Sequence, residues 1–375
     1  MKKIGVAILG LGSVGGSVYR ILTTHREFYQ KTQGVDIEVV SVLEKERSRV
    51  EKLSVPEEKI ASNIAEVVCN PDVNLVVECI GGVEAAKEYA LAAFNIGKSV
   101  VTGNLELYAK YADELERVAK RHNAGLFYGA SCMGGIPAVR LLLDGVTGDG
   151  ICSVVGTVSE EESAKYQLAV LSSLAFNTKV SYESVKSEPL DSVSHQDKKS
   201  GCSLGFCLKP LFSGKKCESG ISAGVYPALV KKTHPLGSCD NALLVKGESM
   251  GEVVMCGGEA DFSSYASGLV SDVIYAATHT EIKYSTYAQE PAKGGFTEDD
   301  FSAYYLRLSA NEAGALAKIS SALDKNHIDV VQMQQCKGSI VLITEPTRRS
   351  TLNCAIEKIN ATGLAKVEAV VRAVL

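Results

Sequence analysis

A glycine-rich stretch near the start of the chain has the spacing of a phosphate-binding loop. ILGLGSVGGSV places Gly10, Gly12 and Gly15 after an apolar strand pattern and before a helix pattern. In a GxGxxG loop the first glycine permits a tight turn, the second lets the backbone approach a pyrophosphate, and the third lets helix and strand pack closely. The free N–H groups of the following helix favour the phosphate charge. The stretch therefore predicts a dinucleotide site.

The loop residues of this predicted site are Gly10, Leu11, Gly12, Ser13, Val14 and Gly15. The alternative interpretation is a fold of the same kind that no longer binds nucleotide.

The end of the second strand pattern, VLEKERSR, bears on the choice of dinucleotide. Glu44 could accept a hydrogen bond from a ribose 2′-hydroxyl, which favours NAD. A cation could instead hold a 2′-phosphate, which favours NADP; the candidates are Lys45, Arg47 and Arg49. A solvated charged loop explains any one of these side chains equally well, so the sequence leaves NAD and NADP both open.

Two later strand patterns end in residues that suit the same edge of a sheet. Gly81 follows the strand at 75–79, and Thr102 and Asn104 follow the strand at 99–102 in VTGNLELYA. An oxidoreductase would place a cation or a proton carrier near such a strand end. Leu105 places hydrocarbon there instead.

The elements that must position these residues alternate along the first third of the chain. Short apolar strand patterns at 3–9, 37–43, 75–79 and 99–102 are separated by helix patterns, including 84–95 and 107–123. Ser62 is the expected cap of a further helix that ends near residue 70. Repeated βα units predict an α/β fold, a Rossmann-like doubly wound parallel sheet with helices on both faces.

The rest of the chain predicts two further regions. The segment 151–290 mixes helix and strand patterns, an α+β texture, and AQEPAKGGFTEDD at 288–300 reads as a linker. The segment 303–375 has the order βαββαβ, a small ferredoxin-like unit.

Composition limits the class of protein. The chain has 375 residues, 46% hydrophobic and 22% charged, with a net charge of −5. No basic stretch is dense enough for nucleic acid, and no apolar run approaches the ~20 residues that span a bilayer. The 11 cysteines include no CxxC pair and lie mostly in apolar runs, which predicts buried, reduced thiols. We expect a soluble, cytoplasmic protein whose partners are small molecules and copies of itself.

Longer motifs resemble the homoserine dehydrogenase family. They are the glycine loop, VECIGGVEAAKEYALAAFNIGKSVVTGN, GASCMGGIP and the HPL…DNALLVKGE…GE run, in that order. The resemblance implies an NAD(P)-binding Rossmann domain at 1–130, a shortened substrate and dimerisation domain at 131–290, and an ACT domain at 300–375. It also implies a homodimer or higher oligomer, and interconversion of L-aspartate 4-semialdehyde and L-homoserine on the route to threonine and methionine.

The chain departs from the family where catalysis is expected. Leu105 stands where the family has a lysine near nicotinamide and substrate, and Gly129 replaces a glutamate associated with a monovalent cation, so no metal is expected. The best alignment places Ser163 and Gln167 at the catalytic aspartate and lysine. Lys165 is close, but two residues along a helix turn a side chain by ~200°, which favours a solvated surface lysine.

Two more segments follow from the resemblance. Glu259 and Asp261 replace glycines of the family's last cofactor-facing loop, which must then move away or bind cofactor weakly. SANEAGALAKI matches the first loop and helix of an ACT domain, which implies an amino-acid effector near Asn311, Gly314 and Ala315. A unit that only dimerises is the alternative.

Three functions remain open on the sequence. The first is a degenerate homoserine dehydrogenase-like protein. The second is an active oxidoreductase that recruits Lys165, His234 or Tyr265. The third is an amino-acid sensor based on the ACT unit.

Overall fold

The protein divides into two compact units, and each unit is built from three separate segments of the chain. The computed structural model describes residues 1–158, 160–189, 191–217, 220–258, 261–279, 288–291, 301–310, 314–336 and 338–375. The first unit comprises Met1–Gly148, Ala169–Lys179 and Glu259–Gln289. The second comprises Asp149–Leu168, Val180–Gly258 and Glu290–Leu375.

A parallel sheet forms the centre of the first unit. Its order is β3-β2-β1-β4-β5-β6. The strands are β1 (Lys2–Leu9), β2 (Val35–Leu43), β3 (Ile60–Ala61), β4 (Leu75–Glu78), β5 (Ser99–Thr102) and β6 (Leu126–Phe127). The chain order reverses between β1 and β4, as in a doubly wound sheet. The predicted fold class is therefore confirmed.

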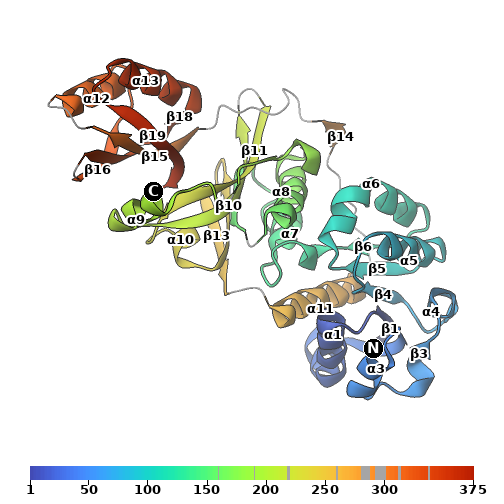
Figure 1. Ribbon diagram of the computed structural model, residues 1–375. Coiled ribbons are helices and arrows are strands. Elements are labelled where there is room, and N and C mark those ends of the chain that lie inside the picture. Colours follow the sequence, from blue (N-terminus) through green and yellow to red (C-terminus); the bar gives the residue numbers. More distant parts are fainter. Residues whose placement is uncertain are drawn as a thin grey trace. The chain divides into compact units, whose positions relative to one another are not determined.

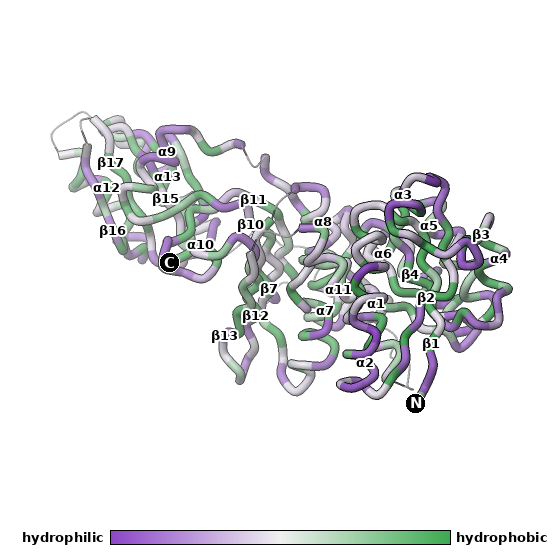
Figure 2. Tube along the Cα trace, turned by 90° about the horizontal axis from the view of Figure 1, so that it is seen from below, coloured by the Kyte–Doolittle hydropathy of each residue, from purple (hydrophilic) through white to green (hydrophobic). Residues whose placement is uncertain are grey.

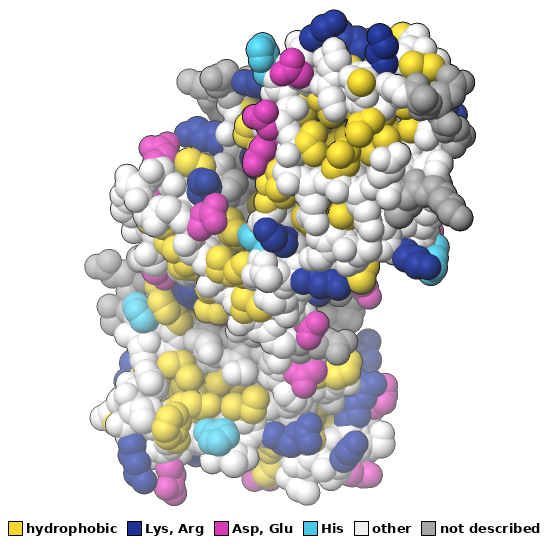
Figure 3. Space-filling model, turned by 90° about the vertical axis from the view of Figure 1, so that its left-hand side faces the viewer, with side chains coloured by type: hydrophobic (Ala, Val, Ile, Leu, Met, Phe, Trp, Pro, Cys, Tyr) yellow, Lys and Arg dark blue, Asp and Glu magenta, His cyan; other side chains and the backbone are white. Residues whose placement is uncertain are grey.

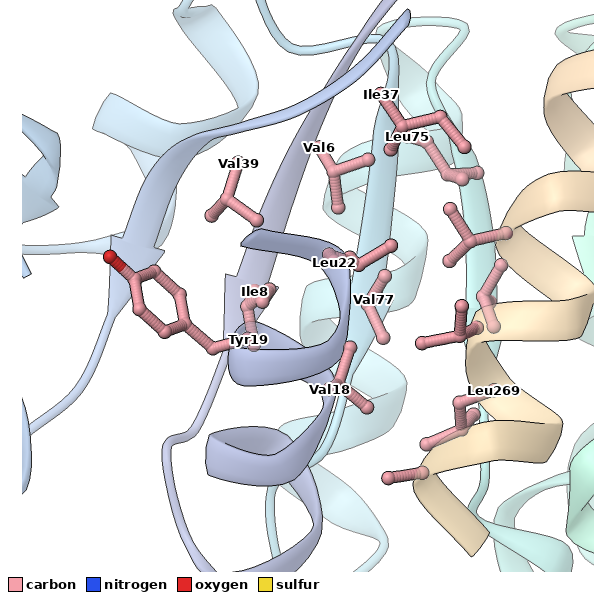
Figure 4. Packing of buried hydrophobic residues seen from close by; sticks show 14 of the residues in the cluster. Val6, Ile8, Val18, Tyr19, Leu22, Ile37, Val39, Leu75, Val77 and Leu269 are labelled. Carbon is pink, nitrogen blue, oxygen red and sulfur yellow. The ribbon is translucent and has the colours of Figure 1, made fainter. Parts of the chain in front are cut away.

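Helices cover both faces of this sheet because its strands are apolar on both sides. On one face lie α1 (Ser13–Thr24) and α11 (Phe262–Thr278), which pack against each other. Val6 and Ile8 of β1, Val77 of β4 and Leu269 of α11 belong to one buried cluster (Figure 4). The opposite face carries α5 (Glu84–Asn95) and α6 (Leu105–Arg121) (Figure 1). A late segment of the chain thus completes the core of its first domain.

Figure 2 shows hydrophobic residues along the central strands of this sheet and hydrophilic residues at the turns. The remaining elements of the unit are α2 (Arg26–Gln33), α3 (Arg47–Lys52), η1 (Glu57–Lys59), α4 (Ile64–Cys69), η2 (Gly129–Ser131), α7 (Ala138–Arg140), the π-helical turn η3 (Leu141–Gly145) and β8 (Thr178–Lys179).

Two predicted helix starts need correction. The cap of α4 is Asn63 rather than Ser62, because the Asn63 side chain accepts a hydrogen bond from the N–H of Glu66. Helix α6 begins at Leu105 rather than at 107, because the Asn104 side chain caps it through the N–H of Leu107. Leu105 therefore lies in the first turn of a helix.

A mixed sheet runs through the described part of the second unit in the order β13-β12-β7-β10-β11-β19-β15-β17-β16, with β9 beside β11 and β18 beside β15. The first group of elements is β7 (Ile151–Thr157), α8 (Glu161–Phe176), η4 (Tyr182–Ser184), β9 (Lys186–Ser187), α9 (His195–Ser203), β10 (Phe206–Cys217), β11 (Gly220–Lys231), α10 (Pro235–Ser238), β12 (Asn241–Gly247) and β13 (Glu252–Gly257). The part of α8 from Ala169 onward belongs to the first unit. The second group is β15 (Phe301–Ser309), α12 (Ala315–Asp324), β16 (Val330–Cys336), β17 (Ser339–Thr344), β18 (Thr347–Arg348), α13 (Arg349–Ala361) and β19 (Lys366–Val374).

The second group has the predicted βαββαβ arrangement. Its four main strands lie in the order β19-β15-β17-β16, with α12 and α13 packed together. Strand β19 also pairs in parallel with β11, through Ala228 opposite Arg372. The C-terminal unit therefore continues the sheet of the preceding region.

The structure differs from two other predictions, which concern the linker at 288–300 and the burial of the cysteines. The predicted linker at 288–300 contains β14 (Ala288–Pro291), which pairs with β8, while 292–300 lie outside the described residues. The ten described cysteines are free, but only Cys132 is fully buried, and Cys69, Cys202, Cys256 and Cys354 are exposed. The prediction of mostly buried thiols is wrong because an apolar run does not reveal which of its faces meets water.

The described surface carries both signs of charge. On the face shown in Figure 3, basic and acidic side chains are interspersed among hydrophobic ones. No helix in the described part of the chain is long and apolar enough to cross a membrane.

Candidate dinucleotide-binding site

The glycine loop lies at the carboxyl end of β1, where the strand order reverses. The surroundings of its three glycines differ, and so does the reason for a glycine at each position. Gly10 has φ +87, and a Cβ there would lie 2.9 Å from the carbonyl oxygen of Cys79. A Cβ on Gly15 would lie 2.0 Å from the carbonyl oxygen of Gly10. Both positions therefore need glycine for the fold itself.

Gly12 is different because its surroundings are open. A Cβ on Gly12 would meet only Arg49 Nη1 within 4 Å, at 3.6 Å, which is an ordinary contact. Packing within the protein does not require a glycine there. Close approach of the protein backbone to a pyrophosphate would require a glycine there, and this is the role expected of the middle glycine.

The start of α1 beside Gly12 is suited to an anion. Gly12 provides no capping side chain, and the first turn of α1 holds no acidic residue. Ser13 is exposed, Val14 is half-buried and Leu11 is buried. The N–H groups of this turn and the helix dipole favour a phosphate.

Glu44 and Arg49 lie beside the loop. The N–H of Leu11 donates to Glu44 Oε2 (2.5 Å), and the N–H of Glu46 donates to Glu44 Oε1 (2.9 Å). Burial opposes ionisation of Glu44, but these N–H groups and Arg49 outweigh it and lower its pKa. Arg49 Nη1 is 3.6 Å from Glu44 Oε2. Glu44, the carboxylate predicted to bind the ribose, therefore accepts a hydrogen bond from the glycine loop itself, and Arg49 is the cation next to it.

The other two candidate cations lie differently. Arg47 pairs with Glu57 and with Glu51, whose carboxylate is 3.7 Å away, and Lys45 is exposed. Of the three cations that the sequence suggests for a 2′-phosphate, the structure brings Arg49 to the glycine loop.

Hydrogen bonds join the carboxyl ends of β4 and β5. The Thr102 hydroxyl donates to Glu78 Oε2 (2.6 Å), the N–H of Asn104 donates to Thr102 Oγ1 (3.0 Å), and Asn104 Nδ2 donates to the carbonyl oxygen of Gly82 (2.7 Å). Gly81 lies in the same loop with no atom within 4 Å of its Cβ position. Three predicted edge residues, Gly81, Thr102 and Asn104, are thus brought together.

Sequence reasoning missed Glu78, which organises this edge. Its side chain is buried, Ile80 N–H donates to its other oxygen at 2.7 Å, and burial raises its pKa to about 7. The available signal was one acidic residue closing the apolar run LVVE. Leu105, on the other side of the Asn104 cap, is buried in the first turn of α6 and offers no titratable group.

The segment after β6 has a carboxylate from another element at the position where the family resemblance implies a glutamate. A Cβ on Gly129 would lie 2.6 Å from Asp272 Oδ1 of α11. Asp272 accepts hydrogen bonds from the N–H of Ala130 (2.9 Å) and from Arg140 Nη2 (3.3 Å). Burial raises the pKa of Asp272 in spite of Arg140. The cation beside this carboxylate is a guanidinium belonging to the chain.

Ser163 and Gln167, which the family resemblance aligns with a catalytic aspartate and lysine, lie on α8. Ser163 and Gln167 are one turn apart and half-buried. Lys165 Nζ is 4.0 Å from Glu161 Oε1, with a third of its side chain exposed (33%). Lys165 therefore lies in a partly solvated ion-pair position along the helix.

Two other candidates, Asp261 and His234, cap helices. Asp261 caps α11, since its Oδ1 accepts from the N–H and the hydroxyl of Ser264 (both 2.8 Å). His234 caps α10 by accepting from the N–H of Leu236 (3.2 Å), and burial lowers the pKa of His234. Tyr265 lies in the first turn of α11.

Of the three effector candidates, the structure describes Gly314 and Ala315 but not Asn311. Gly314 has φ +88 immediately before α12, and Ala315 is the buried first residue of that helix. Asn311 and Glu259 lie outside the described residues. Within the described residues, no group of three or more His, Cys, Asp or Glu side chains could hold a metal ion.

A parallel sheet with a reversal of strand order and a GxGxxG loop at that reversal defines a dinucleotide-binding protein of the Rossmann class. Residues 10–129 match the family model described as homoserine dehydrogenase, NAD binding domain, and residues 162–274 match the model described as homoserine dehydrogenase. A homoserine dehydrogenase of Mycobacterium tuberculosis (strain H37Rv) is 30% identical over 387 residues, covering 89% of this chain and 87% of the relative. The chain belongs to the homoserine dehydrogenase family.

Other relatives agree with this assignment. The homoserine dehydrogenase of Bacillus subtilis (strain 168) is 26% identical over 419 residues, covering 96% of this chain and 95% of the relative. The crystal structure of a homoserine dehydrogenase from Thiobacillus denitrificans superposes with a TM-score of 0.84 at 28% identity, covering 100% and 98% of the two chains. The S. aureus enzyme at pH 7.5 shares the fold, with a TM-score of 0.74 at 20% identity, covering 100% and 99%.

Proposed function

We propose that this chain binds NAD or NADP as a homoserine dehydrogenase-like protein of threonine and methionine metabolism, and that it is a poor catalyst of hydride transfer on homoserine or L-aspartate 4-semialdehyde. The observation that supports binding is the open Cα of Gly12 beside an uncapped α1. The observation that supports weak catalysis is hydrocarbon at Leu105.

The binding part assigns a role to each described group. The pyrophosphate would lie over Gly12 and accept hydrogen bonds from the N–H groups at the start of α1. The adenosine ribose would lie toward Glu44 and Arg49, at the end of β2. A hyperthermophilic archaeal homoserine dehydrogenase mutant, 21% identical to this chain, has been solved in complex with NADPH.

The catalytic part depends on proton transfer. A positioned proton carrier contributes ~10²–10⁴ in rate, which is roughly 3–5 kcal/mol of barrier. Leu105 cannot carry a proton, and the neutral side chains of Ser163 and Gln167 do not titrate near neutral pH. Lys165, the nearby alternative proton carrier on α8, lies in an ion-pair position beside Glu161. The positions that should hold the reaction's titratable groups therefore supply none.

Calorimetry and a homoserine assay test the two parts separately. We expect NAD(H) or NADP(H) to bind, and homoserine oxidation to stay far below that of the Bacillus subtilis relative measured in parallel. Homoserine turnover at an ordinary enzyme rate would refute the catalytic part. Absence of dinucleotide binding at millimolar concentration would refute the binding part.

An active oxidoreductase with a rebuilt site is the second candidate, and Glu78 favours it. Its carboxyl group titrates at about pH 7 at the same edge as Leu105, and a general acid or base works best near the operating pH. Against this role, Glu78 is 1% exposed, and both of its oxygens accept hydrogen bonds. Turnover that is present in the parent and abolished in Glu78→Gln would support the second candidate.

We also propose that the C-terminal βαββαβ unit is an ACT domain that binds an amino-acid effector, and that the chain forms a homodimer or a higher oligomer. Strand β16 ends the described sheet order, and it exposes Val330, Val331 and Met333 at 41%, 45% and 47%. An apolar edge strand suits pairing with a second copy. Sedimentation of the parent as a monomer at micromolar concentration would refute the oligomer.

A further inference from the structure

A cavity in the second unit lies outside the dinucleotide site. Strands β9, β10 and β11 line one part of it, and the start of α13 together with β19 lines the other. Figure 1 labels β10, β11, α13 and β19. Its volume is about 490 Å³, within the range of small-molecule sites. The walls come from the βαββαβ unit and from the preceding region, which meet through the pairing of β11 with β19.

The cavity is lined by more positive than negative charge. Its charged residues are Lys186, Glu188, Arg349 and Arg372, which give a net charge of +2. Glu188 pairs with Arg372, and the Arg372 guanidinium also lies 4.2 Å from the centre of the Tyr226 ring. One cation is therefore balanced by a carboxylate of the wall.

Arg349 is a lining cation without an ion-pair partner among the described residues. It is half-buried, and its guanidinium carbon is 5.3 Å from the centre of the Tyr304 ring. As the first residue of α13 it lies where the helix dipole also favours an anion. Asn353, one turn later on the same face, adds an amide donor to the lining.

A hydroxyl also belongs to the lining. Ser213 of β10 is only 4% exposed as a residue and lines the cavity. A hydroxyl donates readily to an oxyanion. Ser213 therefore adds a donor opposite the start of α13.

We propose that this cavity binds a small dianionic metabolite, a phosphate monoester or a dicarboxylate, with its anionic group on Arg349 and Ser213. A dianion suits a lining that holds more positive than negative residues, whereas a zwitterionic amino acid such as threonine would bring an ammonium group to it. Since the two walls belong to different regions of the second unit, the ligand would link them and stabilise their pairing.

Calorimetric titration of the full chain in low salt tests this site, with inorganic phosphate, succinate and L-threonine as probes. The decisive variant is Arg349→Gln, and its matched control is Arg348→Gln, a neighbouring arginine outside the lining. A charge-assisted hydrogen bond is worth about tenfold or more in affinity. We expect Arg349→Gln to weaken binding by at least about tenfold and Arg348→Gln to change it by less than about twofold.

Every outcome bears on the proposal. Binding of phosphate or of succinate that is lost in Arg349→Gln and retained in Arg348→Gln supports it, and shows which class of dianion is bound. Ser213→Val should weaken the same binding while the melting temperature confirms a folded chain. Phosphate bound only at the glycine loop would be unaffected by Arg349→Gln, and that result overturns the proposal. Binding of L-threonine alone, or of no probe, also overturns it.

Discussion

Substituting two glycines of the same loop should separate cofactor binding from folding. Gly12→Ala adds a methyl group whose nearest neighbour, Arg49 Nη1, is 3.6 Å away, so the fold accommodates it. Gly15→Ala adds a methyl group 2.0 Å from the carbonyl oxygen of Gly10, over an ångström too close. One substitution meets open space that the cofactor needs, and the other meets the protein's own backbone.

The expected magnitudes differ accordingly. For Gly12→Ala, the methyl group displaces the pyrophosphate from the N–H groups of α1, and one lost charge-assisted hydrogen bond costs ~1.5–3 kcal/mol, or ~10- to 100-fold in Kd. Its free energy of unfolding should change by no more than about 1 kcal/mol. Gly15→Ala should lower the free energy of unfolding by about 3 kcal/mol because the helix and strand must separate.

Calorimetry with NAD and NADP, and urea unfolding of each variant, measure these two effects. If Gly12→Ala binds dinucleotide as tightly as the parent, the pyrophosphate does not approach Gly12 and the proposed binding mode is wrong. If Gly15→Ala is as stable as the parent, the close contact with Gly10 does not exist in solution.

Three other substitutions test separate parts of the first unit. Leu105→Lys should restore no measurable homoserine oxidation, because Ser163 and Gln167, which the family resemblance aligns with the catalytic pair, also carry no titratable group; activity appearing in this single variant would show that the site is largely intact. Glu78 has a pKa raised by burial from 4.5 to about 7, so its contribution to stability is fully present below pH 4.5 and falls by about 3 kcal/mol as the pH rises to 7. Glu78→Gln should flatten the pH dependence of the melting temperature across that window, and an unchanged profile would contradict the raised pKa. Asp272→Ala leaves Arg140 and the N–H of Ala130 without their buried acceptor and should cost about 3 kcal/mol in urea unfolding; an equal loss in the control Asp144→Ala, at an exposed partner of Arg140, would argue against a special role for Asp272.

The parallel sheet of the first unit could be predicted from the sequence alone, because the patterns that indicate its strands and helices are local. Each strand is a short apolar run, and glycines such as Gly10 and Gly97 mark the turns that follow strands and helices. These patterns depend only on residues a few positions apart, so they can be read without knowing the tertiary contacts.

The chemistry of the edge depends on distant contacts and was less predictable. Nothing near Glu78 in the sequence shows that Thr102 will donate to its carboxylate. The carboxylate of Asp261 suggested repulsion of a cofactor phosphate, whereas in the structure it accepts hydrogen bonds at the start of α11. Gly129 suggested only a lost glutamate, because Asp272 lies more than a hundred residues later in the chain.

The position of α11 has a consequence for how the protein is made. This helix covers the sheet face that includes Val6, Ile8 and Val77, yet its residues extend to Thr278. A ribosome that has released only the segment up to Gly148 holds six paired strands with one apolar face incompletely covered. Domains generally fold as units during synthesis, and exposed apolar surface at that stage favours aggregation or capture by chaperones. The nucleotide-binding fold of this chain is therefore completed late in translation, after most of the region that follows it in sequence has already emerged.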